Sequence, residues 1–300
     1  MSFLTTGLTR HFLPDDKKIP AIEFCYGIFL YLRTHKYIIY IVKKHILDLF
    51  LTRVVHLHER YVLLQATNPV APLPEMLPGQ FAQIRVDGSK ETFLRRPVSI
   101  HNVDRQANEV SFLVQIVGEG TRALSRLQTG DTLNVILPLG NGFTMPESPD
   151  EKVLLVGGGV GVAPLLYLGV RMREMGVEPT FLLGARSQSD LLQQEAFRAV
   201  GRVFVTTEDG TAGERGFVTQ HSLLQKERFT RICVCGPKPM MLAVARYAKS
   251  VSTPCEVSLE NMMACGLGAC LCCVEDTQQG NVCVCTEGPV FNINQLKWQI

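Results

Sequence analysis

The sequence predicts a chain built from an antiparallel β-barrel, a doubly wound α/β domain and a small cysteine-rich domain, in that order. Three observations predict this fold class. Short β-rich runs separated by turns fill residues 52–149, and buried apolar runs alternate with helical stretches across residues 150–256. Six of the ten cysteines then crowd into residues 257–300. Residues 1–51 precede these parts as an extension of unknown role.

The composition excludes some classes of function. A formal net charge of +2 over 300 residues leaves no electrostatic footprint for nucleic acid. The crowded cysteines do not resemble the disulfide framework of a small secreted domain, so we expect a reducing cytoplasm. The start of the chain shows no apolar segment with a cleavage site, so we do not expect secretion.

The extension is rich in apolar residues, but charged residues and histidines interrupt it. Its longest uncharged run, 24–32, is far shorter than the roughly 20 residues that a spanning helix needs, so we expect no membrane span. Three alternatives stay open for this segment. It is an amphipathic helix on a membrane or partner, an appended helix on the body of the protein, or residues translated from an over-long gene start.

The barrel is predicted from six β-rich runs with turn-forming stretches between them, at the regular spacing of a β-barrel. These runs are 54–57, 61–66, 81–86, 98–100, 110–117 and 133–137. One all-β domain therefore ends near Glu147.

The α/β domain is predicted from strands that alternate with helices. The continuous apolar run 152–156 is typical of a strand buried on both faces of a parallel sheet. Further strands are expected at 179–184, 202–206 and 231–235, and helices at 165–175, 189–199, 216–225 and 239–250. This alternation predicts a doubly wound sheet.

The cysteine-rich segment has the ligand spacing of a plant-type [2Fe–2S] cluster. Cys265, Cys270 and Cys273 form a C-x4-C-x2-C pattern, and a fourth cysteine follows. Thiolates also bind zinc, but a structural zinc site usually pairs its ligands in two short C-x2-4-C turns. The small residues of the four-residue gap let backbone N–H groups face the sulfurs of an anionic cluster. The spacing therefore favours the cluster and leaves Cys272 and Cys283 as the neighbouring thiols that could be confused with ligands.

The glycine-rich segment 157–164 follows a buried strand and opens a helix, which is the context of a dinucleotide site. Glycines there let a pyrophosphate approach the backbone at the positive end of the helix. The pattern is not the full G-x-G-x-x-G, because Val160, Ala163 and Pro164 change its later positions. The alternative is a tight turn without a ligand.

Two motifs in the barrel suggest a bound anion or flavin. In the segment 96–99, an arginine close to a hydroxyl can hold a diphosphate or the edge of a flavin. A match of four residues by itself would arise by chance. Gly120 and Thr121 open a short helix whose free N–H groups could bind phosphate, and the alternative is an ordinary capped turn. The neighbouring Arg95 is expected to be a surface charge.

Cys235 stands at the C-terminal end of a later strand, where open α/β sheets bind ligands. A thiol there could contact a nicotinamide, and a buried structural cysteine is an equally good interpretation. Cys25, Cys233 and Cys255 are expected to be small buried residues. The histidines form no metal or nucleophile pattern and no paired carboxylates suggest hydrolysis, which fits hydride transfer through a flavin.

These motifs stand in one fixed order that resembles the ferredoxin-NADP reductase superfamily, and most closely the electron-transfer subunits of class 1B dihydroorotate dehydrogenase. The resemblance runs from about residue 52 to the C-terminus. Its most specific segments are 95–100, 138–143, 207–213, 216–219, 258–270 and 285–291.

The resemblance implies three cofactor sites and a role for each motif. For FAD it implies Arg96, Pro97, Val98, Ser99, Leu113, Val114, Gln115, Gly120 and Thr121. For NAD it implies Gly157, Gly158, Gly159, Gly161, Pro164, Gly236, Pro237 and Met240, with Cys235 as the catalytic residue. For the [2Fe–2S] cluster it implies Cys265, Cys270, Cys273 and Cys285, with Cys283 as an alternate fourth ligand.

The resemblance also implies a partner. A catalytic dihydroorotate dehydrogenase subunit carrying FMN would pass electrons through the cluster and FAD to NAD+ in pyrimidine biosynthesis, in a heterotetramer with two copies of each chain. One alternative is an NAD(P)H:ferredoxin-type reductase subunit with another partner, in which Arg186 or Arg202 could meet a 2′-phosphate. The other is a zinc-stabilised docking protein.

Overall fold

The computed structural model describes residues 33–34, 37–38 and 43–300. The short strands β1 (Arg33–Thr34) and β2 (Tyr37–Ile38) pair antiparallel within a first unit, Met1–Ile41. The second unit, Val42–Ile300, holds all of the remaining elements. The alternatives stated for the extension, and Cys25 with it, lie almost entirely outside the described residues.

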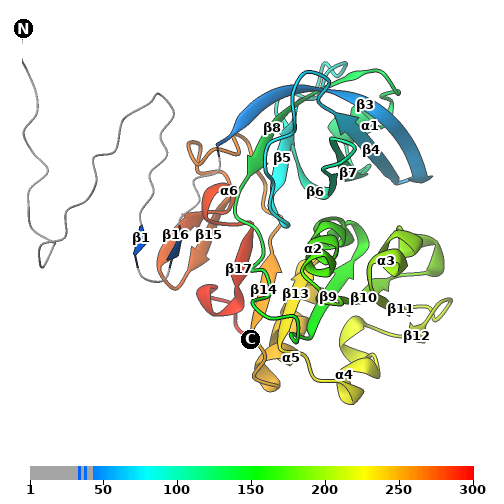
Figure 1. Cartoon of the computed structure of the whole chain (residues 1–300), viewed down its shortest axis with the longest axis vertical. Helices are drawn as coiled ribbons and strands as arrows, with labels where there is room; N and C mark the ends of the chain where they lie inside the picture. The colour runs from blue at the N-terminus through cyan, green and yellow to red at the C-terminus, as the bar shows by residue number, and fades with distance from the viewer. Residues whose placement is uncertain (1–32, 35–36, 39–42) are drawn as a thin grey trace, which may run out of the picture. The chain divides into compact units, whose positions relative to one another are not determined.

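Six antiparallel strands close into a barrel in the order β3-β4-β7-β6-β5-β8 (Figure 1). They are β3 (His45–His58), β4 (Tyr61–Thr67), β5 (Phe81–Ile84), β6 (Arg96–Asp104), β7 (Glu109–Gln115) and β8 (Thr132–Leu139), and the helix α1 (Glu119–Ser125) lies between β7 and β8. The strand β3 begins ahead of the predicted boundary at residue 52. Residues 45–51 alternate between the two faces, with Leu49 and Leu51 buried and Ile46 and Phe50 exposed.

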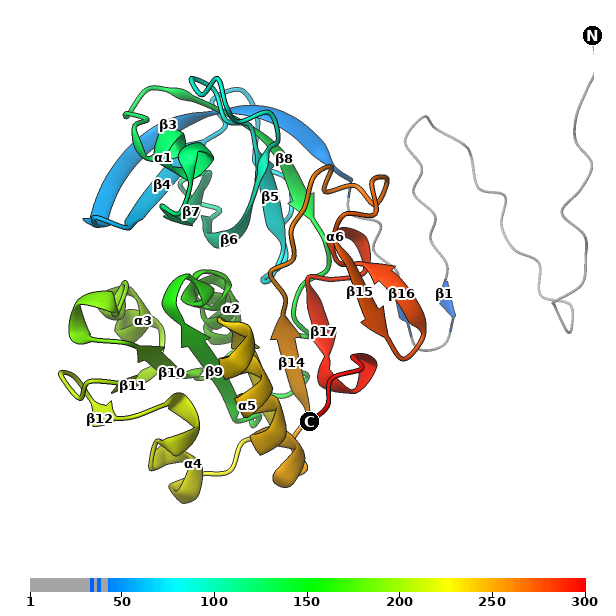
Figure 2. The ribbon, with the colours of Figure 1, turned by 180° about the vertical axis from the view of Figure 1, so that it is seen from behind.

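The nucleotide domain contains a seven-stranded sheet in the order β12-β11-β10-β9-β13-β14-β17, in which β17 alone runs antiparallel to its neighbour (Figures 1 and 2). Its strands are β9 (Val153–Gly158), β10 (Thr180–Ala185), β11 (Arg202–Thr207), β12 (Glu214–Arg215), β13 (Arg231–Cys235), β14 (Cys255–Ser258) and β17 (Val290–Asn292). Its helices are α2 (Ala163–Glu174), α3 (Gln194–Val200), α4 (Leu223–Lys226) and α5 (Lys238–Ser250). The barrel and this domain confirm the predicted fold class.

The helices cover both faces of this sheet, as expected for a doubly wound domain. Leu165 of α2 and Phe197 of α3 belong to one buried cluster, and Leu224 of α4 and Val244 of α5 belong to another. The predicted helix over 216–225 is instead a 3-10 turn, Val218–Gln220, followed by the short helix α4.

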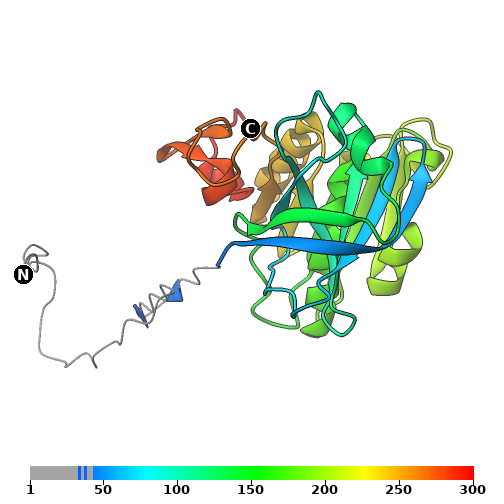
Figure 3. The same cartoon turned by 90° about the horizontal axis from the view of Figure 1, so that it is seen from above.

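The cysteine-rich segment shares its core with the other two domains. It contains β15 (Val274–Thr277), β16 (Gly280–Cys283), α6 (Val284–Glu287), β17 and the 3-10 turn Ile293–Gln295. Cys273 and Cys285 lie in one buried cluster with Phe81 of the barrel and Leu154 of the sheet. Figure 3 shows this orange-to-red segment beside the barrel and the sheet. The strand β17 therefore extends the nucleotide sheet and carries the cysteine-rich segment with it.

The barrel is fixed over the start of α2 by two buried contacts. The hydroxyl of Tyr167 donates to the carbonyl of Met76 at 3.0 Å, and His101 Nδ1 lies 2.8 Å from the carbonyl of Ala163. Burial lowers the pKa of His101 to about 4, so the ring is neutral near pH 7 and donates from Nδ1. This contact places the barrel next to the glycine turn that precedes α2.

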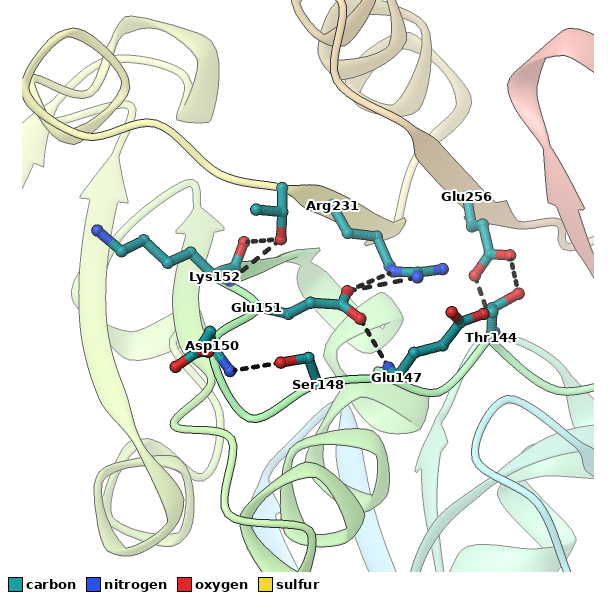
Figure 4. Close-up of polar contacts among 9 residues, drawn as sticks. Thr144, Glu147, Ser148, Asp150, Glu151, Lys152, Arg231 and Glu256 are labelled. Carbon is teal, nitrogen blue, oxygen red and sulfur yellow. Dashed lines mark hydrogen bonds and ion pairs between the residues drawn. The ribbon is translucent and has the colours of Figure 1, made fainter.

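The linker between the barrel and β9 is held by a polar network (Figure 4). Glu151 accepts from the backbone N–H of Glu147 at 2.6 Å and pairs with Arg231 of β13 at 3.4 Å. Thr144 donates to Glu256 of β14 from its backbone N–H at 3.0 Å and from its hydroxyl at 2.5 Å. The linker is thus tied to two strands of the nucleotide sheet.

Candidate functional site

A cleft of about 740 Å³ lies between the barrel and the C-terminal edge of the nucleotide sheet. The barrel lines it with Tyr61 of β4 and Gln115 of β7, and the sheet lines it with the glycine turn after β9 and with Gly236 after β13. This is the edge at which open α/β sheets bind their ligands. The structure therefore brings the predicted nucleotide segments to one place and joins a predicted flavin residue, Gln115, to them.

The glycine turn is shaped so that side chains would not fit. A Cβ atom on Gly161 would lie 2.5 Å from the carbonyl oxygen of Cys235, and one on Gly158 would lie 2.6 Å from the sulfur of Met240. Gly159 has a φ of +57°, and Pro164 occupies the first turn of α2. The turn thus exposes backbone to the cleft at the start of a helix, as a pyrophosphate requires.

The cleft also holds a polar atom without a partner in the described part of the chain. Thr206, at the end of β11, is 1% exposed, and its hydroxyl makes no hydrogen bond there. A buried hydroxyl normally finds a partner, so this atom fits a nucleotide bound in the cleft. Glu208 lines the same wall beside Arg186, whereas Arg202 makes a two-bonded ion pair with Glu227.

The thiol of Cys235 is buried at the end of β13, and burial raises its pKa. Gly236, Pro237 and Met240 line the cleft, whereas Cys235 itself does not. A thiol with a raised pKa stays protonated and is a weak nucleophile. Any role of Cys235 in the reaction is therefore one of contact and packing.

Several residues of the cleft were not among the predicted site residues, and two of them, Tyr61 and Glu260, have shifted pKa values. Tyr61 stands at the floor of the cleft, accepts from Gln115 Nε2 at 3.4 Å, and has a raised pKa because it is buried. Glu260 also lines the cleft. Desolvation of its carboxyl raises its pKa, although the residue as a whole is exposed to solvent. The sequence feature that could have indicated Glu260 is its position shortly before the cysteine motif. Tyr61 gave no signal beyond the start of a strand.

The flavin motif lies on β6, on the face of the barrel that looks outward. Val98 packs inside the barrel, so Pro97 and Ser99 point to the opposite face. The guanidinium of Arg96 lies over Gly120, where an added Cβ would sit 2.7 Å from Nε. The structure therefore joins the two predicted flavin segments, and a larger residue at position 120 would displace the guanidinium of Arg96.

The other predicted flavin residues lie on β7 and in the first turn of α1. The side chains of Leu113 and Val114 are buried. The Thr121 hydroxyl accepts from the N–H groups of Val117 and Gly118 at 2.9 and 3.1 Å, as in the capped-turn alternative. Arg95 is not the expected surface charge, because it donates to the Asn134 side chain at 2.5 Å inside the barrel wall.

The cysteine loop directs backbone N–H groups to the sulfurs. The N–H of Leu267 lies 3.3 Å from the sulfur of Cys265, and the N–H of Gly268 lies 3.1 Å from the sulfur of Cys285. The first contact lowers the pKa of Cys265 to about 6. Gly266 and Gly268 have φ values of +69° and +83°, which glycine adopts without strain. This is the donor arrangement expected around an anionic cluster.

The thiols of the predicted ligands lie close enough to influence one another. Cys265 interacts with Cys270, and Cys285 interacts with Cys273 and Cys265. Cys283 also interacts with Cys273, Cys270 and Cys265. Across residues 43–300, no point brings three or more possible ligands together around a single ion.

Cys283 contacts the carbonyl of Gly268 at 3.9 Å rather than an N–H, and Cys272 is exposed, as is the predicted ligand Cys270. Cys233 and Cys255 are buried, which confirms that expectation.

Known proteins match both halves of the site. Residues 260–297 match the iron–sulfur cluster binding domain of dihydroorotate dehydrogenase B, and residues 155–246 match the oxidoreductase NAD-binding domain. Relatives named dihydroorotate dehydrogenase B (NAD(+)), electron transfer subunit, share 41% identity in Shouchella clausii and 40% in Listeria monocytogenes serotype 4b. These alignments cover 73% and 74% of this chain and 86% and 88% of the relatives.

Solved structures share the fold. A chain of an NADH-dependent reduced ferredoxin-NADP oxidoreductase, studied for flavin-based electron bifurcation, is 30% identical with a TM-score of 0.75, over 83% of this chain and 90% of that one. A ferredoxin NADP+ reductase from Neisseria gonorrhoeae, with bound FAD and NADP, is 16% identical with a TM-score of 0.55, over 69% and 91%, and shows the fold alone.

The fold and the site define an oxidoreductase of the ferredoxin reductase type with an attached iron–sulfur domain. The chain belongs to the family of dihydroorotate dehydrogenase B electron transfer subunits, as the resemblance predicted. Among the described residues, no helix has the length and apolar character needed to cross a membrane.

Proposed function

We propose that this chain carries electrons between an FMN-bearing dihydroorotate dehydrogenase subunit and NAD+, through a [2Fe–2S] cluster and FAD. The observation that carries the proposal is the shared packing of three sites. The cluster loop shares a buried core with β5 of the barrel, which pairs with the flavin strand β6, and the barrel and the nucleotide turn face each other across one cleft. Electrons need such short, continuous contact between the groups that carry them.

Each group of residues has a defined task in this proposal. FAD and the cluster, when bound, supply the conversion between single electrons and a hydride, which side chains cannot perform. Arg96 offers a planar charged fork to the flavin diphosphate, and the backbone of the glycine turn accepts the nucleotide pyrophosphate. Cys265, Cys270, Cys273 and Cys285 hold the cluster, and the buried Cys235 packs behind the loop residues Gly236, Pro237 and Met240 that line the nucleotide cleft.

The charges in the cleft support NAD rather than NADP. Glu208 lines the cleft at the end of β11 and would repel a 2′-phosphate, whereas a carboxylate can accept a hydrogen bond from a ribose hydroxyl. Arg202 forms an ion pair with Glu227. Of the two arginines that could meet a 2′-phosphate, Arg186 lines the cleft and Arg202 does not. We therefore propose NAD+ as the electron acceptor.

An exposed apolar surface around the cysteine loop supports the partner. Met262, Leu267 and Leu271 are 85%, 45% and 65% exposed, and they flank the exposed Cys270. Exposed apolar side chains grouped at one site mark an interaction surface. We propose that this surface, the cluster-loop surface, docks on the catalytic subunit in a heterotetramer with two copies of each chain.

We also propose that the protein is located in the cytoplasm. The cysteines of the described residues form no disulfides, which is typical of a reducing compartment.

The relative with 30% identity favours a second candidate, a reductase subunit that serves a ferredoxin. The test is to purify the chain alone and with candidate partners. We expect bound FAD, iron and acid-labile sulfide, NADH-dependent dye reduction, and no oxidation of dihydroorotate by the single chain. Dihydroorotate turnover by the chain alone, or failure to bind a dihydroorotate dehydrogenase subunit, would contradict the proposal, and zinc in a colourless protein would favour a docking role.

A further inference from the structure

A buried glutamine lies between the barrel and the cysteine loop. Gln83 of β5 is 0% exposed, and neither Nε2 nor Oε1 of its carboxamide has a hydrogen-bond partner in the described part of the chain. Removing a carboxamide from water without giving it a partner costs free energy, so such groups are rare in folded proteins. An orphaned carboxamide therefore indicates a bound group with which it pairs.

The alternation of β5 determines where this side chain points. Ala82 and Ile84 face the interior of the barrel, so Gln83 and Phe81 face outward. Phe81 packs in the buried cluster that contains Cys273 and Cys285. The outward face of β5 is thus the face that meets the cysteine-rich segment.

Gln83 contacts the cysteine loop at Gly266, which directly follows Cys265, the first predicted ligand. A Cβ atom on Gly266 would lie 2.6 Å from Gln83 Cγ and 2.9 Å from Gln83 Nε2. The carboxamide nitrogen therefore lies against the backbone that directly follows Cys265. Across the sheet, Gln83 pairs with Pro97 of the flavin motif, so it stands between the flavin strand and the cluster loop.

We propose that Gln83 Nε2 donates a hydrogen bond to a sulfur on the Cys265 side of the cluster and thereby raises its reduction potential. The inference rests on the proposed function, in which these cysteines hold a [2Fe–2S] cluster. Reduction adds an electron to a group that is already anionic, and an N–H dipole stabilises that added charge. The buried position strengthens the effect, because no water screens it.

The test is the substitution Gln83→Met, which keeps the length of the side chain and removes the donor. The readout is a redox titration of the full chain with its flavin and cluster, followed by electron paramagnetic resonance. We expect the equilibrium constant for cluster reduction to fall about tenfold, which equals about 59 mV for a one-electron couple. The flavin potential, taken from the same titration, should change less.

The matched control is Gln65→Met on β4, whose carboxamide donates to Glu109 at 2.9 Å. This variant should leave the cluster potential unchanged. An unchanged potential in Gln83→Met with full iron content would overturn the inference. If Gln83→Met does not load iron, Gln83→Leu carries the test, because it also removes the donor and introduces no group that can ionise.

The two levels of the proposal fail in different ways. A wild-type chain without iron and sulfide would overturn the proposed function and this inference with it. A wild-type cluster whose potential is insensitive to Gln83→Met and Gln83→Leu would overturn this inference alone.

Discussion

The nucleotide cleft and the cluster loop both depend on glycines, but they are built in different ways. In the cleft, Gly158 and Gly161 follow a regular strand, and the neighbouring strand β13 fixes their positions. In the cluster loop, Gly266 and Gly268 lie between cysteines in a segment without helix or strand, at positive φ. The cleft is therefore formed by the sheet, whereas no regular element shapes the loop, and we expect its order to depend on the cluster.

This difference separates two kinds of failure. A change in the cleft should block access of the nucleotide to a site that is otherwise intact. A change in the loop should cause loss of the metal and local unfolding of the loop, because metal binding and local folding are coupled. Either region should therefore be open to damage while the other stays functional.

The largest effect is expected from Cys285→Ser. A serine oxygen is a hard ligand and a poor substitute for a thiolate, so the cluster should be lost. The sulfur of Cys285 accepts the N–H of Gly268 at 3.1 Å, as a thiolate ligand does. Iron and acid-labile sulfide per chain give the measurement.

The control for this change is Cys283→Ser, two residues earlier. Cys283 contacts the carbonyl of Gly268 at 3.9 Å, so its replacement should leave the iron content at the wild-type level. Loss of iron in Cys283→Ser, with retention in Cys285→Ser, would reverse the assignment of the fourth ligand. Flavin content should stay the same in both variants.

The next effect concerns the cleft and is expected from Gly161→Val. An added Cβ would lie 2.5 Å from the carbonyl of Cys235, so the turn and the nucleotide must move. A displacement of about 1 Å can cost about 100-fold in rate, and we expect a loss of this size in NADH-dependent dye reduction. Iron content should be unchanged.

The control for Gly161→Val is Gly130→Asn. Gly130 has a φ of +94° in open space, and asparagine tolerates this region of φ better than other residues. Dye reduction by Gly130→Asn should match the wild type. Equal rates for all three proteins would show that the glycine turn does not position the nucleotide.

A smaller effect is expected at the cluster-loop surface. Met262→Asp places a charge on the apolar surface proposed to dock on the catalytic subunit, where removal of a central contact costs about 1–2 kcal/mol, or roughly tenfold in Kd. The control is Val70→Asp, an equally exposed residue of the barrel, with 88% exposure against 85%. Binding to the catalytic subunit by surface plasmon resonance separates them, and equal losses would place the interface elsewhere.

The sequence predicted the regular parts of both regions and missed what depends on distant packing. The buried run 152–156 and the glycines that follow it indicated a strand and a turn, because parallel strands are apolar on both faces. The first half of β3 was missed because Asp48 seemed to interrupt an apolar run, whereas it alternates outward and accepts from Asn134 at 2.6 Å. Local pattern could not show that partner, which comes from β8.

The importance of Gln83 was beyond the reach of the sequence for the same reason. A glutamine inside a β-run is normally the polar, solvent-facing half of an alternating strand. Here the cysteine-rich segment covers that outward face, since Gly266 lies against the carboxamide. Only the folded chain brings these two residues together.

The smallest effect is expected in the linker that both regions share, at Glu151→Gln. The substitution keeps an acceptor for the N–H of Glu147 and removes the charge that faces Arg231, so the free energy of unfolding should fall by about 1 kcal/mol at pH 7. Hydrogen bonding by Glu147, with a contribution from Arg231, lowers the pKa of Glu151 in the folded chain. A carboxyl whose pKa is lowered by folding stabilises the folded chain at pH values above its pKa in the unfolded chain, about 4.5. This contribution is lost as the pH falls through the pKa of the folded chain.

Urea unfolding of the wild type and of Glu151→Gln should therefore differ by the same amount at pH 8 and pH 6, and converge as the pH is lowered below about 4.5. The control is Glu195→Gln, whose ion pair with Arg198 is far more exposed and should contribute less than about 0.5 kcal/mol. A difference that persists unchanged at low pH would mean that packing, and not the charge of Glu151, joins the linker to the nucleotide sheet. Because this linker is tied to β13 and β14, its loss should lower the stability of the nucleotide sheet.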